Sequence, residues 1–196
     1  MFRQATYPLL LVLSPTLTAS PGAALERRLR KAALRRQPLV IGAPAEPYDP
    51  ADDDRFGAAR SLLSDLVRQE GLEITVTTGT SRILRDLELF VELDKRHAVA
   101  MRVMVPAATP ELQLQAARAL AAEGIATTVL CAPVDSDEGE GEEALRRSFA
   151  AASEAGARDV EMDAPAPGRP ERERFLSLLR RLRLEHGFPR ETAGRG

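Results

Sequence analysis

The segment LVIGAPAEPYDPADD, residues 39–53, is an apolar run that ends in glycine and continues into a loop bounded by prolines. The run predicts a buried strand. The loop carries Glu46, Tyr48 and Asp49 at the carboxyl end of that strand, where α/β sheets place ligand-binding groups. We therefore take these three residues as ligand-binding candidates. The equal alternative is a rigid turn in which Tyr48 caps the core.

The pattern of an apolar run followed by a helical segment recurs about every 25 to 30 residues on both sides of this segment. Further strands are predicted at 9–14, 73–78, 99–105, 126–132 and, more weakly, 159–164, and the last helix at 171–187. This alternation predicts βα units around a parallel sheet with outer helices. Even spacing and the lack of a G-x-G-x-x-G loop favour a TIM-type barrel, or part of one, over a doubly wound sheet.

The length of 196 residues fits one domain, which we place at 1–187 with a flexible tail at 188–196. A net charge of −2 gives no broad positive field, so we expect no nucleic-acid partner. No apolar run approaches the length of a membrane span. The start, MFRQATYPLLLVLS, imitates a secretory signal, but similar runs recur downstream as strands, and we interpret it as the first strand.

Cys131 is the one cysteine, which excludes an intramolecular disulfide and an iron–sulfur cluster held by this chain alone. With only His97 and His186 besides, we expect no metal site. Cys131 lies at a strand end as either a reactive thiol or a small buried residue, and we favour the second. A single thiol and no convincing export signal indicate the cytoplasm.

Thr78 ends the third predicted strand, and Thr80 and Ser81 follow it. Their hydroxyls and the first amides of the next helix form a candidate cradle for a small anion, and N-capping alone is the competing explanation. No serine or cysteine has a credible partnered base, so we assign no catalytic residue.

Two groups of charged residues are interpreted as solvent-facing. Arginines at 180, 181 and 183 form the polar face of the last helix. An acidic loop at 135–143 does not match the spacing of a calcium-binding EF-hand and is expected to complement the start of the next helix. Its acidic residues are Asp135, Asp137, Glu138, Glu140, Glu142 and Glu143.

Three stretches, IGAPAEPYDPADD, TVTTGTSRILRDLELFVELDKR and ALAAEGIATTVLCAPV, resemble the radical S-adenosylmethionine proteins related to spore photoproduct lyase. The resemblance runs from about residue 8 to about residue 160 in unchanged order. It implies a barrel that holds S-adenosylmethionine and an iron–sulfur cluster at the carboxyl ends of its strands.

The chain departs from this family where the cofactors bind. The family's C-x-x-x-C-x-x-C loop is absent, and Gly79 stands where the family has a lysine. After the fourth strand the family has a long segment rich in Glu-Pro and Pro-x-Pro, whereas here VMVPAATPEL passes directly into a helix. The chain begins where the family's second unit would begin, so we expect a (βα)6 partial barrel without the first unit.

These observations lead us to expect a cluster-less barrel that acts as a binding or partner subunit without radical chemistry. The exposed edge of the first strand would be covered by a second copy or by a protein partner. The alternative is an enzyme that binds S-adenosylmethionine or another small anionic ligand at the strand ends, with the iron–sulfur unit supplied by another chain. A natural start upstream of Met1 is a third reading.

Overall fold

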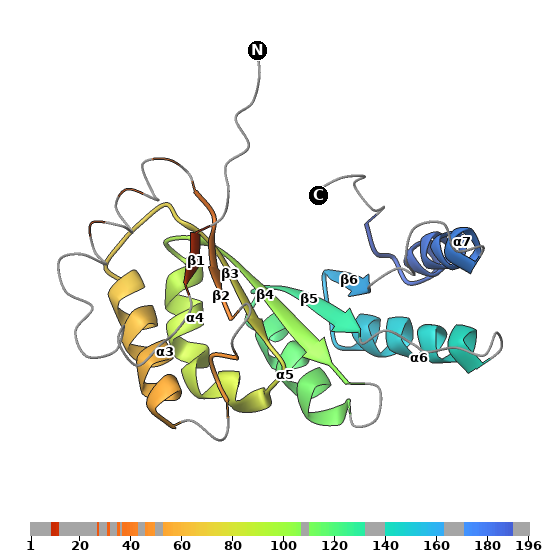
Figure 1. Ribbon diagram of the computed structural model, residues 1–196, viewed down its shortest axis with the longest axis horizontal. Helices are drawn as coiled ribbons and strands as arrows, with labels where there is room; N and C mark the ends of the chain where they lie inside the picture. Colours follow the sequence, from red (N-terminus) through yellow and green to blue (C-terminus); the bar gives the residue numbers. More distant parts are fainter. Residues whose placement is uncertain are drawn as a thin grey trace, which may run out of the picture.

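The computed structural model describes residues 9–11, 27, 31, 35, 37–42, 46–49, 53–106, 110–131, 140–162 and 171–189. Its strands form one parallel sheet in the order β1-β2-β3-β4-β5-β6 (Figure 1). The strands are β1 Leu9–Leu11, β2 Leu39–Ile41, β3 Glu73–Thr78, β4 Ala98–Val105, β5 Ala126–Cys131 and β6 Asp159–Met162. The α/β class and the parallel strands are as predicted.

From β2 onward, each strand is followed by a helix. The helices are α3 Asp53–Leu66, the 3-10 helix η1 Ser81–Asp86 with α4 Leu87–Asp94, α5 Glu111–Ala122, α6 Glu140–Glu154 and α7 Glu171–Glu185. Parallel neighbours require such crossovers because the chain must return to the starting edge of the sheet.

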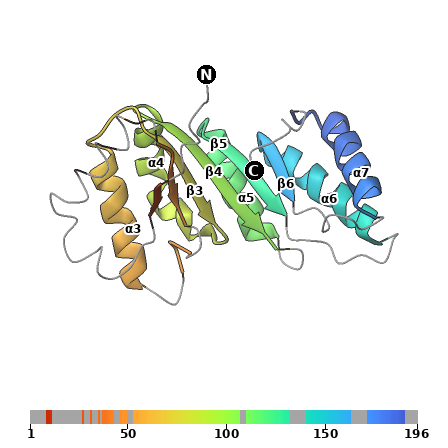
Figure 2. The same cartoon turned by 45° about the horizontal axis from the view of Figure 1, so that its top comes forward.

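The order of the strands decides which face of the sheet is covered. Crossovers between parallel strands share one hand, so an order that never reverses places the helices on one face. Both views show α4 and α5 on the same side of the sheet (Figures 1 and 2). Burial alternates accordingly along β4: Met101 and Val103 are fully buried, whereas Ala100 and Arg102 are partly exposed. We call the second side the open face.

The core lies between the sheet and the helices. Leu66 of α3, Phe90 of α4, Leu120 of α5 and Phe149 of α6 are all completely buried. Because each helix supplies at least one such side chain, the described helices and the sheet share one continuous core.

The expectation for the acidic segment was partly wrong. Glu140, Glu142 and Glu143 were placed in an acidic loop, but they belong to α6. Glu142 accepts hydrogen bonds from Arg146 and from Arg181 of α7. The first three acidic residues of the expected loop lie outside the described residues.

Phe188, which was expected to start the flexible C-terminal tail, packs into the core. Phe188 is buried, and its ring packs edge-on against Phe149 with centroids 5.8 Å apart. The Phe188 amide donates to the Arg183 carbonyl, and Arg183 itself is buried instead of facing solvent. Residues 12–14 of the first predicted strand and those from 190 onward lie outside the described residues.

Gly42, directly after β2, holds a backbone shape that a side chain would disrupt. Its φ is +91°, and an added Cβ would lie 2.0 Å from the Thr77 carbonyl oxygen. The close approach of this loop to β3 therefore requires glycine.

We predict that Gly42→Ala lowers the free energy of unfolding by more than about 2 kcal/mol, because it adds backbone strain to a clash with the main chain. Urea unfolding followed by circular dichroism measures this loss. Gly57→Ala is the matched control. Gly57 lies within α3 with open space around it, so alanine there should stabilise the protein by about 0.5–1 kcal/mol. Equal effects of the two changes would contradict the described loop.

Candidate functional site

The Glu46 carboxylate joins the loop after β2 to the carboxyl end of β3. Its Oε1 accepts hydrogen bonds from the Thr78 hydroxyl at 2.7 Å and the Tyr48 amide at 3.0 Å. Its Oε2 accepts from the Gly79 amide at 2.7 Å. Glu46, Tyr48, Thr78, Gly79 and Thr80 together form what we call the carboxyl-end cluster.

Thr80 completes this cluster as the N-cap of η1. Its hydroxyl accepts from the Arg82 amide at 3.3 Å, and its own amide donates to the Thr78 hydroxyl at 3.2 Å. The capping explanation is therefore confirmed for Thr80. Ser81 is the first residue of η1. Since the Thr78 hydroxyl and Gly79 amide both donate to Glu46, a carboxylate of the protein already occupies the place expected for an anion.

Tyr48 lies in the core, with only 1% of its surface exposed. Its hydroxyl donates to Asp86 Oδ2 at 3.1 Å, and Arg60 donates to the other oxygen of that buried carboxylate. Burial, followed by the charge and hydrogen bond of Asp86, raises the pKa of Tyr48 well above its ordinary value. The phenol is held in its neutral, donating form.

Four of the six predicted ligand-binding residues thus meet in one hydrogen-bonded network. Asp49 is near it, since its carbonyl oxygen accepts from Arg82 Nη1 at 3.2 Å. Their contacts with one another fit the rigid-turn alternative, and ligand binding by Glu46, Tyr48, Asp49, Thr78, Thr80 and Ser81 stays a prediction.

The open face carries a second polar group that the sequence analysis missed. Thr77, Arg102, Thr128 and Asp159 are aligned across β3 to β6 by the strand register. Arg102 donates to Glu161 of β6, and both side chains remain partly exposed, at 39% and 45%. The signal was present in the sequence, because a charged side chain within the apolar run VAMRVMV requires a partner.

Two polar atoms of this row lack a partner. Thr77 Oγ1 and Arg102 Nε are buried and make no hydrogen bond within the described part of the chain. They are cross-strand neighbours, because Thr77 is opposite Arg102 in the register of β3 and β4. Buried polar atoms are nearly always paired, so an unpaired neighbouring couple is a place where a bound group is expected.

Gly79 lies close to Met104 and Glu46. A Cβ at this position would lie 3.2 Å from Met104 Cε and 3.7 Å from Glu46 Oε2. The Gly79 carbonyl also accepts from Gln113 of α5 at 3.0 Å. A side chain at this position would require the end of the Met104 side chain to shift slightly, whereas its distance to Glu46 would be an ordinary contact.

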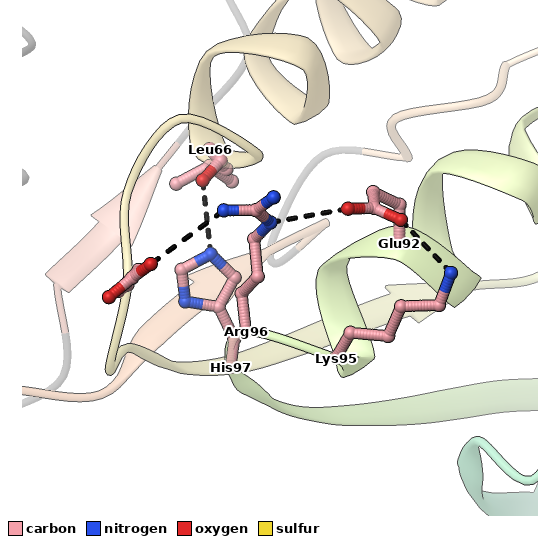
Figure 3. Close-up of polar contacts among 6 residues, drawn as sticks. Leu66, Glu92, Lys95, Arg96 and His97 are labelled. Carbon is pink, nitrogen blue, oxygen red and sulfur yellow. Dashed lines mark hydrogen bonds and ion pairs between the residues drawn. The ribbon is translucent and has the colours of Figure 1, made fainter.

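A hollow of about 650 Å³ lies at the opposite, amino end of the sheet, between Ala98, Ala100, Lys95, Arg96 and other residues. Figure 3 shows Lys95 and Arg96 turned toward Glu92, with hydrogen bonds of 3.1 and 3.2 Å. These cations already have carboxylate partners, and they lie near helix carboxyl ends, which favour positive side chains. Lys95 and Arg96 are therefore paired without an anionic ligand.

His97, beside this hollow, has a structural position. Its Nδ1 accepts from the Leu72 amide at 3.1 Å, which leaves Nε2 to donate to the Leu66 carbonyl at 3.0 Å. Figure 3 shows the ring directed at that carbonyl. Both ring nitrogens are used to join α3 to the start of β3 and β4.

Cys131 ends β5 and packs against the core, and burial raises the pKa of its thiol. This is the environment of an inert thiol. Within the described residues, no group of three histidine, cysteine or acidic side chains is placed to hold a metal ion.

No family model, curated protein or solved structure matches the chain. In the part of the chain that the structure describes, none of the helices combines the length and apolar character needed to cross a membrane.

Glu46→Gln should lower the free energy of unfolding by about 1–3 kcal/mol. The reason is that three donors surround the carboxylate, namely the Thr78 hydroxyl and the Tyr48 and Gly79 amides, whereas a glutamine side chain offers them only one acceptor atom. Thermal and urea unfolding measure the change. Glu123→Gln, at an exposed site after α5, is the control and should change stability by less than about 0.5 kcal/mol. A similar loss in both variants would contradict the structural role of Glu46.

We also predict that Tyr48 stays protonated in the folded protein at pH values where an exposed tyrosine ionises, about 10. Because its folded-state pKa is raised, its contribution to stability is complete below that pH and is lost as the pH rises above it. Tyrosinate absorbance, recorded together with circular dichroism, should show Tyr48 ionising only on unfolding, and Tyr48→Phe should remove that late step. Ionisation of both tyrosines in the native state would refute this prediction.

Proposed function

We propose that this chain is a partial TIM-type barrel that binds a small polar ligand on its open face and does not perform radical chemistry. One observation carries the proposal: Thr77 Oγ1 and Arg102 Nε are buried and unpaired within the described residues, and the two residues are opposite each other in the register of β3 and β4. Thr128 and Glu161 provide further polar groups on the same face. The sequential parallel strands support the barrel, since each strand is added on the same side of the previous one.

The chemistry of these groups indicates the kind of ligand. Arg102 Nε is a donor, and the Thr77 hydroxyl can donate, so together they suit an acceptor group such as a carboxylate. S-adenosylmethionine is the first ligand to test, because it carries a carboxylate and because of the family resemblance. Its charged amino group would find Glu161 close to Arg102.

The iron–sulfur cluster of the family that the sequence resembles does not fit this chain. Cluster ligation needs several thiolates, and Cys131 is the one cysteine, packed against the core. We therefore assign no step that passes through a cluster.

A partner at the β1 edge is also part of the proposal. Among the described strands, β1 pairs only with β2, so its other edge is where a second copy or a protein partner would add. A cytoplasmic location completes the proposal.

Isothermal titration with S-adenosylmethionine tests the binding site. We expect the wild-type protein to bind, and Arg102→Gln to weaken binding about 10- to 100-fold through the loss of a charged hydrogen bond. Thr77→Val should weaken it less. Arg118→Gln, an exposed change on α5, is the control and should leave affinity unchanged.

Two results would contradict the proposal. Absence of heat with the wild-type protein would exclude S-adenosylmethionine as the ligand. Equal affinity of the wild-type protein and a folded Arg102→Gln variant would exclude the open face as the site.

A further inference from the structure

Arg183, near the carboxyl end of α7, reaches the last strand of the sheet. Its side chain is buried, with 8% exposed, and its Nη1 donates to Asp159 Oδ1 at 2.5 Å and to the Pro189 carbonyl at 3.1 Å. Its Nη2 donates to the Val160 carbonyl at 2.5 Å. The guanidinium therefore joins α7 and the segment after it to β6.

Both backbone groups of Val160, its carbonyl and its amide, form hydrogen bonds with side chains. Its carbonyl accepts from Arg183, and its amide donates to Asp159 Oδ1 at 2.7 Å. The N–H and C=O of one strand residue point to the same side, so a strand added to β6 would need both of these groups. Among the described strands, β6 pairs only with β5 and ends the sheet.

We propose that the ion pair of Arg183 and Asp159 closes the β6 edge against pairing with a second copy of this chain. Unpaired strand edges readily pair with each other, and two identical edges can do so about a twofold axis. Arg183 takes the place that a neighbouring strand would occupy. This inference does not depend on the ligand or on the family resemblance, and it leaves β1 as the edge for normal association.

The acidic side chains of β6 predict how an opened edge would behave. Without Arg183, Asp159 loses its cation, and pairing of two β6 strands would bring Asp159 and Glu161 of both copies close together. These like charges repel, and salt screens the repulsion. Association through an opened β6 edge should therefore strengthen as salt is added.

Sedimentation velocity of Arg183→Met, over a series of protein concentrations at about 0.05 M and about 1 M salt, tests this inference. The variant should form larger assemblies than the wild-type protein, with at least about tenfold tighter association at high salt. Arg181→Met is the matched control: Arg181 lies on the same helix, is 54% exposed and pairs with Glu142 and Glu185. It should sediment as the wild-type protein does at both salt concentrations.

Asp159→Ala tests the same edge from the other side of the ion pair. It frees the Val160 amide, removes the carboxylate that holds Arg183 over the edge and removes a repelling charge, so this variant should associate at low as well as high salt. If Arg183→Met unfolds, Asp159→Ala decides. Folded variants that sediment like the wild-type protein at high salt would overturn the proposal. Loss of the folded circular dichroism signal in both would also overturn it, because the pair would then hold β6 in place instead of guarding its edge.

Discussion

The structure depends on a parallel strand order that never reverses. Each strand adds beside the previous one, so crossovers of one hand bring the helices to a single face of the sheet. That face buries the core, while the open face is free to carry polar groups such as Arg102 and Glu161. The same order makes β1 and β6 the terminal strands of the described sheet, and the backbone groups on their outer edges need hydrogen-bond partners other than a strand.

Charged side chains of the chain itself accept hydrogen bonds from backbone groups, or donate them to such groups, at several points. Glu46 accepts the donors of Thr78 and Gly79, so the loop after β2 is fixed by a carboxylate from within the chain. At β6, the Arg183 side chain donates a hydrogen bond to the Val160 carbonyl. Some residues that the sequence suggests as ligand-binding groups are thus hydrogen-bonded to other parts of the same chain. Thr77 Oγ1 and Arg102 Nε make no hydrogen bond within the described residues, and they are the groups at which we propose that a ligand binds.

The sequence predicted local features better than distant contacts. Runs such as EITVTT and VAMRVMV show their strands directly, because burial on the helix side produces alternation. The partner of Glu46 lies 32 residues away, and Arg183 meets Asp159 across 24 residues. No spacing rule relates such positions. Arg183 therefore resembled its exposed neighbours, and only the packing of α7 against β6 distinguishes it.

The covered and open faces of the sheet can be compared most directly through the methyl groups of its threonines. Thr127 and Thr128 are adjacent in β5, yet Thr127 is 1% exposed and Thr128 is partly exposed; Thr78 and Thr75 show the same contrast in β3. In a methyl-labelled sample, a soluble paramagnetic agent should broaden the Thr75 and Thr128 signals and spare those of Thr78 and Thr127. Equal broadening within each pair, or the reverse pattern, would contradict a sheet that is covered on one face and open on the other.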